Sequence, residues 1–252
     1  LAQISDFSSN LSAPLTIMFN PRIYLAGDIS IERQTAMTNW AKQEEAKGGE
    51  IGMHLHMFDD FVSSAGGVIK SEPKVANNFN DGYSTLTTNY SKDEVYKMIM
   101  LGAEYFEKNG IDFPKSYRAG GWYANLETLL AISESGILID SSGRINSPFA
   151  GENLRGSWSL SPTSSPYFPS IYNQNSEAKK RSERVGVFEI PNNGGDSYHM
   201  EAEEMISNFQ SNLGSGILPN SQAVVLVSHP KWWISKEDRK STRLNSSHRI
   251  RS

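Results

Sequence analysis

Two histidines and two aspartates lie within eleven residues, in the stretch EIGMHLHMFDD at positions 50–60. His54 and His56 are two positions apart in a segment typical of a strand, so both side chains leave the same face. Two neutral imidazoles on one face can contribute to a Zn²⁺ site or a similar metal site, which needs at least one further ligand. The alternative is that both histidines are hydrogen-bonded structural residues at a strand end.

The stretch SYRAGGWYAN, at positions 116–125, places an arginine before a pair of glycines. Arg118 falls at the expected end of a strand. Gly120 and Gly121 allow the backbone to approach a ligand closely, and their amides could donate hydrogen bonds to an oxyanion. The alternative is a tight turn between a strand and a helix, with Arg118 in a structural ion pair.

A third candidate stretch, VVLVSHPKWW at positions 224–233, ends an apolar strand on His229. A histidine at this place can act as a general acid or base near neutral pH. Trp232 and Trp233 follow, and paired aromatic rings beside a polar site suit the apolar faces of sugar rings. The alternative is a capping histidine with aromatic side chains that close the rim of the fold.

These candidate residues need a scaffold, and the chain alternates between strand-like and helix-like segments. Helices are predicted by apolar spacing and by capping residues, among them the Ser91–Glu94 capping box. A long loop is expected over 58–90 and an irregular region over 141–184. The predicted strands are 14–19, 50–54, 116–119, 137–140, 185–190 and 223–229, and the predicted helices are 30–47, 91–108, 125–135 and 198–213, the last one capped by Ser197. This alternation favours βαβ units and a parallel sheet in one domain.

Polar residues stand at the carboxyl ends of the predicted strands. They are His54, His56, Arg118, Asp140 and His229. Because ligands bind at this edge of parallel α/β sheets, the sequence predicts that the five side chains surround one site.

The composition limits which chemistry is available. The chain of 252 residues contains no cysteine, so a metal would be held by His, Asp, Glu or water. No apolar run is long enough to cross a bilayer. The first residue is Leu1 rather than Met, so the sequence does not decide between the bacterial cytoplasm and the cell envelope.

Residues 238–252 are predicted to be a non-native, disordered tail, which leaves 1–237 as the catalytic domain. The segment DRKSTRLNSSH is the translation of a common sequencing-adapter oligonucleotide. The alternative is a basic, serine-rich tail that binds an acidic partner. The tail carries five of the 24 basic residues and one of the 28 acidic residues, so the rest of the chain has a net charge of −8. This charge argues against nucleic acid as a partner.

Taken together, GGEIGMHLHMF, SYRAGGWYANLETL with GILIDSS, and VVLVSHP resemble the second, third and last motifs of polysaccharide deacetylases of the NodB-homology class. The H-x-H pattern resembles the branch associated with surface-polysaccharide gene clusters. The resemblance implies a distorted (β/α) barrel of parallel strands, related to the TIM barrel, with one catalytic divalent metal that is usually zinc. An Asp-Asp motif follows the first strand of the family, and nothing before Pro14 matches it, so the first strand, the base and a metal ligand are expected upstream of Leu1.

For the metal, the resemblance assigns His54 to the first histidine ligand of the family. The second histidine normally lies four residues further on, where this chain has Phe58. His56 is therefore the expected second ligand, with Asp59 and Asp60 as alternates.

For catalysis, the resemblance assigns Arg118 to the arginine that positions the base, and without that base the arginine is expected to lack a nearby counter-charge. Gly121 matches the oxyanion amide, and His229 matches the general acid. The Asp-Trp pair of the fourth motif is not recognisable beside Asp140. The residues expected to contact substrate or to support the site are Asp140, Trp122, Tyr123 and Trp232.

The function implied by the resemblance is removal of N-acetyl groups from sugars of a bacterial polysaccharide or its precursor, although this chain alone is expected to be inactive. One alternative is a barrel that binds glycan without turnover. Another is a hydrolase of a different non-peptide C–N bond, such as that of a cyclic amide or an amidine.

Overall fold

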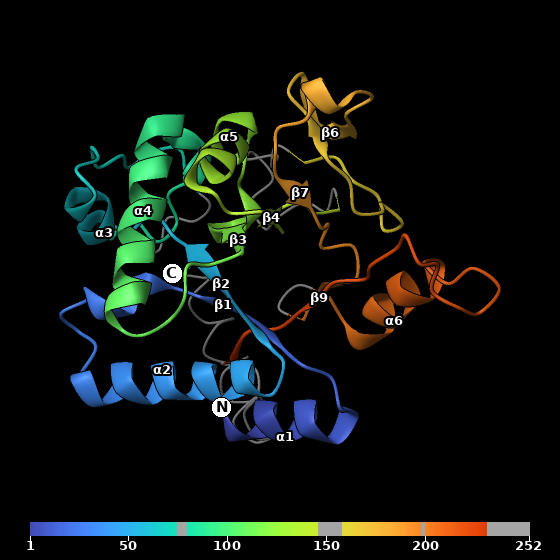
Figure 1. The fold of residues 1–252 in the computed structure, drawn as a ribbon, viewed down its shortest axis with the longest axis horizontal. Helices are drawn as coiled ribbons and strands as arrows, with labels where there is room; N and C mark the ends of the chain where they lie inside the picture. The colour runs from blue at the N-terminus through green and yellow to red at the C-terminus, as the bar shows by residue number, and fades with distance from the viewer. Residues whose placement is uncertain (75–79, 146–157, 198–199, 231–252) are drawn as a thin grey trace, which may run out of the picture.

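A parallel sheet of five strands organises the computed structural model, which describes residues 1–74, 80–145, 158–197 and 200–230 (Figure 1). The strands are adjacent in chain order and every pair is parallel. They are β1 (Thr16–Phe19), β2 (Glu50–Leu55), β3 (Ser116–Ala119), β4 (Ile139–Asp140) and β7 (Phe188–Glu189). The prediction of a mixed α/β fold with a parallel sheet is confirmed.

The register of this sheet lines up the polar strand ends. His54 of β2 pairs with Arg118 of β3, and Asp140 of β4 pairs with Tyr117 on one side and with Glu189 of β7 on the other. Four neighbouring strands therefore present ionisable side chains along one edge.

Three long helices connect the strands. The helix α2 (Ile31–Ala46) joins β1 to β2, α4 (Lys92–Lys108) lies between β2 and β3, and α5 (Leu126–Ser135) joins β3 to β4. Their ends follow the predicted caps: Ser91 and Glu94 form a capping box, and Asn125 accepts from the Thr128 amide. These local signals fix where each helix begins.

The core lies between the sheet and these helices. Met53, Leu55 and Tyr117 from the strands pack in one cluster with Met98 and Phe106 of α4, and all five side chains are completely buried. Burying each side chain of this size contributes roughly 1.5–3 kcal/mol. Figure 1 shows α4 and α5 side by side, and α1 (Ala2–Leu11) lies against α2.

The region predicted as a long loop, 58–90, contains regular structure. The short helix α3 (Asp59–Ser64) begins directly after β2, and a 3₁₀ turn, η2 (Thr87–Asn89), precedes α4. Asp59 and Asp60 occupy the first turn of α3, where acidic side chains are favoured, and Phe61 and Val62 are buried in the core. Two further 3₁₀ turns, η1 (Pro21–Tyr24) and η3 (Gly120–Trp122), follow β1 and β3.

The last third of the chain differs most from the sequence-based expectation. The region expected to be irregular contains an antiparallel pair, β5 (Pro169–Ser170) and β6 (Asn173–Glu177), and a turn, η4 (Arg181–Glu183). The helix α6 (Ala202–Ser211) starts later than predicted, and the prediction of Ser197 as its cap is wrong. The Ser197 hydroxyl instead donates to Ser228, while Glu204 accepts from the Glu201 amide at the helix start.

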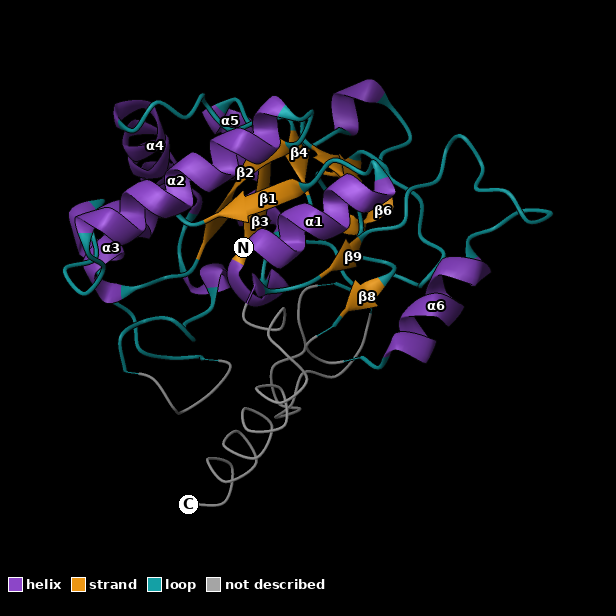
Figure 2. Cartoon of the chain, turned by 90° about the horizontal axis from the view of Figure 1, so that it is seen from below, coloured by secondary structure: helices purple, strands orange, loops and turns teal. Residues whose placement is uncertain are grey.

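A second parallel pair, β8 (Gly195–Asp196) and β9 (Leu226–Val227), stands apart from the five-stranded sheet. Both views place α6 beside this pair (Figures 1 and 2). Within the described ranges β9 does not pair with β1, so the closed barrel stays a prediction. Residues 238–252 lie outside the described residues. None of the helices in the described part of the chain is long and apolar enough to cross a membrane.

Candidate active site

His54 and His56 lie together at the carboxyl end of β2. Their ring centroids are 4.8 Å apart and the ring planes are almost perpendicular. The prediction that both imidazoles leave the same face is confirmed by this contact. His229, which follows β9, is close enough for its charge to lower the pKa of both histidines. Strands that are far apart in sequence thus bring His229 within electrostatic range of the histidine pair.

Each imidazole of the pair is held by a backbone carbonyl. The Nδ1 of His54 lies 2.9 Å from the Arg118 oxygen, and the Nδ1 of His56 lies 2.9 Å from the Tyr83 oxygen. A carbonyl oxygen only accepts hydrogen bonds, so each Nδ1 must carry the proton. The Nε2 of each neutral ring then carries the lone pair that a metal ion requires.

The surroundings keep the two rings neutral. Burial lowers the pKa of His54 well below its usual range, and the neighbouring His56 lowers it further. Burial likewise lowers the pKa of His56 to about 4. His56 also stacks on Tyr83, with ring centroids 4.2 Å apart. At neutral pH both side chains are therefore in the form that binds metal, without having to lose a proton first.

Gly120 explains how the backbone after β3 reaches this close to His56. A Cβ atom at position 120 would lie 2.8 Å from the His56 Nδ1 and 2.8 Å from the Leu55 oxygen. Any side chain there would displace the ring or the strand. The close approach expected of this glycine pair therefore serves the histidine itself.

Gly120→Ala is expected to lower the free energy of unfolding by roughly 1–3 kcal/mol, because the added methyl group overpacks the contact between His56 and the Leu55 carbonyl. Denaturant unfolding measures this change. Gly27→Ala is the matched control, since a Cβ atom at position 27 meets nothing within 4 Å. Equal stability of the two variants would contradict the tight packing around His56.

Arg118 is fixed by Ser141 rather than by an ion pair. Its Nε donates to the Ser141 oxygen and its Nη2 to the Ser141 hydroxyl, both at 2.9 Å. Burial lowers the Arg118 pKa to about 10, and the charges of Asp140, Glu189 and Asp196 oppose this shift. The expectation that Arg118 lacks a nearby counter-charge is wrong, because the charges of these three carboxyl groups act on it.

Two acidic residues of this set were missed by the sequence analysis. Glu189 sits beside Asp140 on the neighbouring strand, and both side chains are completely buried. Asp196 of β8 lies 3.7 Å from the Nδ1 of His229, measured to its Oδ1. An acidic residue inside the apolar segment VGVFEI was a usable signal for Glu189, whereas Asp196 follows a glycine pair without apolar periodicity.

The alternate metal ligands are placed less favourably than the histidines. Asp60 forms an ion pair with Arg22 at 2.8 Å, and its Oδ1 also accepts from the Phe61 amide. Burial, followed by the charges of Asp81 and Asp60, raises the pKa of Asp59. In the described parts of the chain, no group of three or more histidine, aspartate or glutamate side chains is arranged to hold a metal ion.

The remaining predicted site residues are backbone and aromatic groups. Gly121 adopts a φ of +61°, so this turn after β3 requires a left-handed residue at that position. Trp122 is 8% exposed and Tyr123 is 3% exposed, so their rings are packed inside rather than displayed for stacking on a sugar. Trp232 lies outside the described residues.

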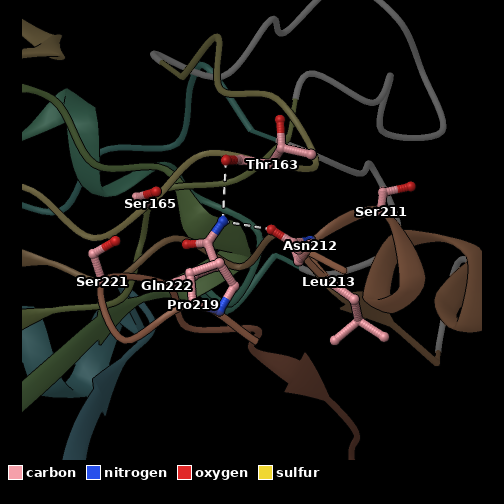
Figure 3. Close-up of a pocket in the computed structure, with 9 residues that line it drawn as sticks. Thr163, Ser165, Ser211, Asn212, Leu213, Pro219, Ser221 and Gln222 are labelled. Atoms are coloured by element: carbon pink, nitrogen blue, oxygen red, sulfur yellow. Dashed lines mark hydrogen bonds between the residues drawn. The ribbon is translucent and has the colours of Figure 1, made fainter. Parts of the chain in front are cut away.

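A cavity of about 270 Å³ lies elsewhere, beside the end of α6 (Figure 3). It is lined by hydroxyl and amide side chains, and Gln222 donates across it to the Thr163 oxygen and to Asn212. None of the predicted site residues lines this cavity. The chemistry of the candidate active site is therefore at the sheet edge and not in this cavity.

No family model and no curated protein matches the chain. Two solved structures are similar to it at low sequence identity. One is assigned as a polysaccharide deacetylase from Mycobacterium smegmatis, with 14% identity and a TM-score of 0.45 over 99% of this chain. The other, from Parabacteroides distasonis, is assigned as a glycoside hydrolase or deacetylase, with 12% identity and a TM-score of 0.47 over 75% of this chain. The chain spans 59% of the first protein and 36% of the second.

Proposed function

We propose that this chain carries the catalytic residues of a metal-dependent hydrolase that removes N-acetyl groups from sugars of a bacterial polysaccharide or its precursor. The observation that carries the proposal is the histidine pair. Both rings are neutral, both are held through Nδ1 by backbone carbonyls, and both keep Nε2 for a ligand. Arg118, at the end of β3, would add a cation, and His229, which follows β9 of the separate pair, would add a proton donor.

The donor set fits a divalent metal, most simply zinc. His54 and His56 would hold it through Nε2, because backbone carbonyls already bind their Nδ1 atoms. When bound, such a metal polarises a carbonyl group and acidifies a water molecule. A catalytic zinc site takes three protein ligands, so one more is needed beyond this pair.

Three other residues, Gly121, His229 and Arg118, would stabilise charge and transfer or position protons. The amide of Gly121 would donate to the oxygen of the acetyl carbonyl as negative charge develops there. His229, with Asp196 at 3.7 Å to favour its protonated form, would give a proton to the departing sugar amine. Arg118 uses only two of its five N–H groups on Ser141, so others can hold a carboxylate that acts as base.

The chain of 252 residues by itself is expected to release no acetate from an N-acetylated chitooligosaccharide, even with zinc added. Two imidazoles leave the metal site incomplete, and affinity depends on the number and charge of the ligands. An enzymatic acetate assay measures this directly. Appreciable acetate release would show that Asp59, Asp60 or Asp140 supplies the base and the third ligand.

The reaction class is tested in a full-length relative with the same motifs. Acetate release from N-acetylated sugars, without ammonia, supports the proposal. Ammonia release from a cyclic amide or an amidine would instead support a hydrolase of another C–N bond. A relative that binds glycan, does not bind metal and does not turn over the substrate would support the non-catalytic barrel.

A further inference from the structure

Asp140 and Glu189 are two acidic side chains that pair across β4 and β7, and both are completely buried. Two neighbouring carboxylate groups that are buried together repel each other, so each disfavours the ionised form of the other. One of the two carboxyl groups is therefore expected to keep a proton.

Within the described residues, the hydrogen bonds of the two carboxyl groups go to the turn that follows β4. Asp140 accepts from the Ser142 hydroxyl at 2.7 Å and from the Ser142 amide at 3.2 Å. Glu189 accepts from the Gly143 amide at 2.8 Å. A Cβ atom at position 143 would lie 2.6 Å from the Glu189 Oε1, so a glycine is needed for this contact.

Ser141, in the same turn, is the residue that holds Arg118. Its oxygen accepts from Arg118 Nε, and its hydroxyl accepts from Arg118 Nη2 and donates to the Ile190 oxygen. The carboxyl pair thus fixes the two residues that follow Ser141. The position of the guanidinium group depends on this turn.

The charges also balance when the pair keeps one proton. Arg118 contributes one positive charge, and the pair then contributes one negative charge. If both carboxyl groups were ionised, an extra negative charge would be buried without compensation, which is strongly unfavourable. The charged or titratable groups near the pair are Arg118, Asp196, Tyr117 and Tyr167.

We propose that Asp140 and Glu189 form a positioning unit that keeps one proton for its two carboxyl groups and holds the 141–143 turn, and through it Arg118, in place for the site. The catalytic role of this unit rests on the proposed function. The retained proton and the contacts of the 141–143 turn are independent of that function. Burial and the neighbouring carboxyl group raise the pKa of Glu189 well above its usual range, in agreement with a retained proton.

The test compares Glu189→Gln with Glu189→Ala in the full chain, without metal or substrate. The glutamine side-chain oxygen can still accept from the Gly143 amide, so this variant should keep the turn. The alanine variant should lose this bond, lower Tm by roughly 2–4 °C or more, and lose the slow exchange of the Arg118 Nε–H signal. Glu177→Gln, at an exposed position, is the matched control.

Infrared spectroscopy reads the proton itself. At neutral pH, the infrared difference spectrum between the native chain and Glu189→Gln should contain the C=O band of a buried carboxylic acid. The difference spectrum between the native chain and Glu177→Gln should not contain this band. The native fold keeps a proton that the unfolded chain loses above the usual glutamate pKa, so native stability should fall relative to Glu189→Gln as the pH rises above that usual pKa.

Absence of the acid band would overturn the retained proton. An unchanged Arg118 Nε–H signal in Glu189→Ala would overturn the positioning role. Neither result depends on deacetylation, so failure of this inference is distinguishable from failure of the proposed function.

Discussion

Replacing His229 with alanine in a full-length relative that carries these motifs is expected to lower the rate of acetate release by about 10²–10⁴-fold. The loss follows from the proposed role of His229 as proton donor to the leaving amine, with Asp196 3.7 Å away to favour the protonated ring. The His229 side chain is 42% exposed, so the substitution removes little packing. Steady-state kinetics should show the loss in kcat, with Tm nearly unchanged.

Ser228→Ala is the control for this experiment. Ser228 is the exposed neighbour of His229, and its hydroxyl accepts from the Ser197 hydroxyl. Its rate should stay close to that of the native enzyme. If His229→Ala also kept the native rate, another group would have to protonate the amine, and His229 would be a structural residue at the end of β9.

Elements with strong local signals were predicted well from the sequence. The helices α4 and α5 begin and end where Ser91, Asn125 and Gly136 indicate, because caps satisfy backbone groups within one turn of the chain. The strands β2 and β3 match the apolar segments 50–54 and 116–119 within one residue. The helices that connect these strands favour their parallel pairing in the sheet.

Elements whose structure depends on distant contacts were not predicted. The helix α3 is only six residues long, and the burial of Phe61 and Val62 in a core built by other segments stabilises it. The apolar segments 185–190 and 223–229 contain strands of only two residues each, β7 and β9. The hydrophobic content of a segment predicts that it is buried, but it does not determine how many of its residues pair with a neighbouring strand.

The same distinction applies to the site. The rule that sites form at strand ends brought His54, Arg118 and Asp140 together, and the register of β2, β3 and β4 agrees with it. It did not identify Tyr83, whose carbonyl and ring hold His56, because the loop that carries Tyr83 has no periodic pattern. Asp196 and Glu189 likewise could not be identified from the sequence, because their partners, His229 and Asp140, are distant in the chain and close only in space.

Removing either imidazole of the histidine pair is expected to weaken zinc binding by this chain at least about 100-fold. Even residues that only support a metal ligand cost about 10–100-fold in affinity when lost, and a direct ligand should cost at least as much. His54→Ala and His56→Ala should lose affinity to a similar extent, because each ring offers one Nε2 and each is held by one carbonyl. Competition with a chromophoric zinc chelator measures the affinities.

Asp60→Asn and Asp59→Asn are the matched controls, and they also test the alternate ligands. Asp60 is engaged by Arg22 at 2.8 Å, so its loss should leave zinc affinity unchanged. Burial and the nearby Asp81 and Asp60 charges raise the pKa of Asp59, and its replacement should likewise leave zinc affinity unchanged. If an aspartate variant lost as much affinity as the histidine variants, the metal would be centred on the start of α3, and His56 would serve only to pack against Tyr83. If neither histidine variant changed the affinity, zinc would bind elsewhere, and the neutral pair at the end of β2 would be a structural contact.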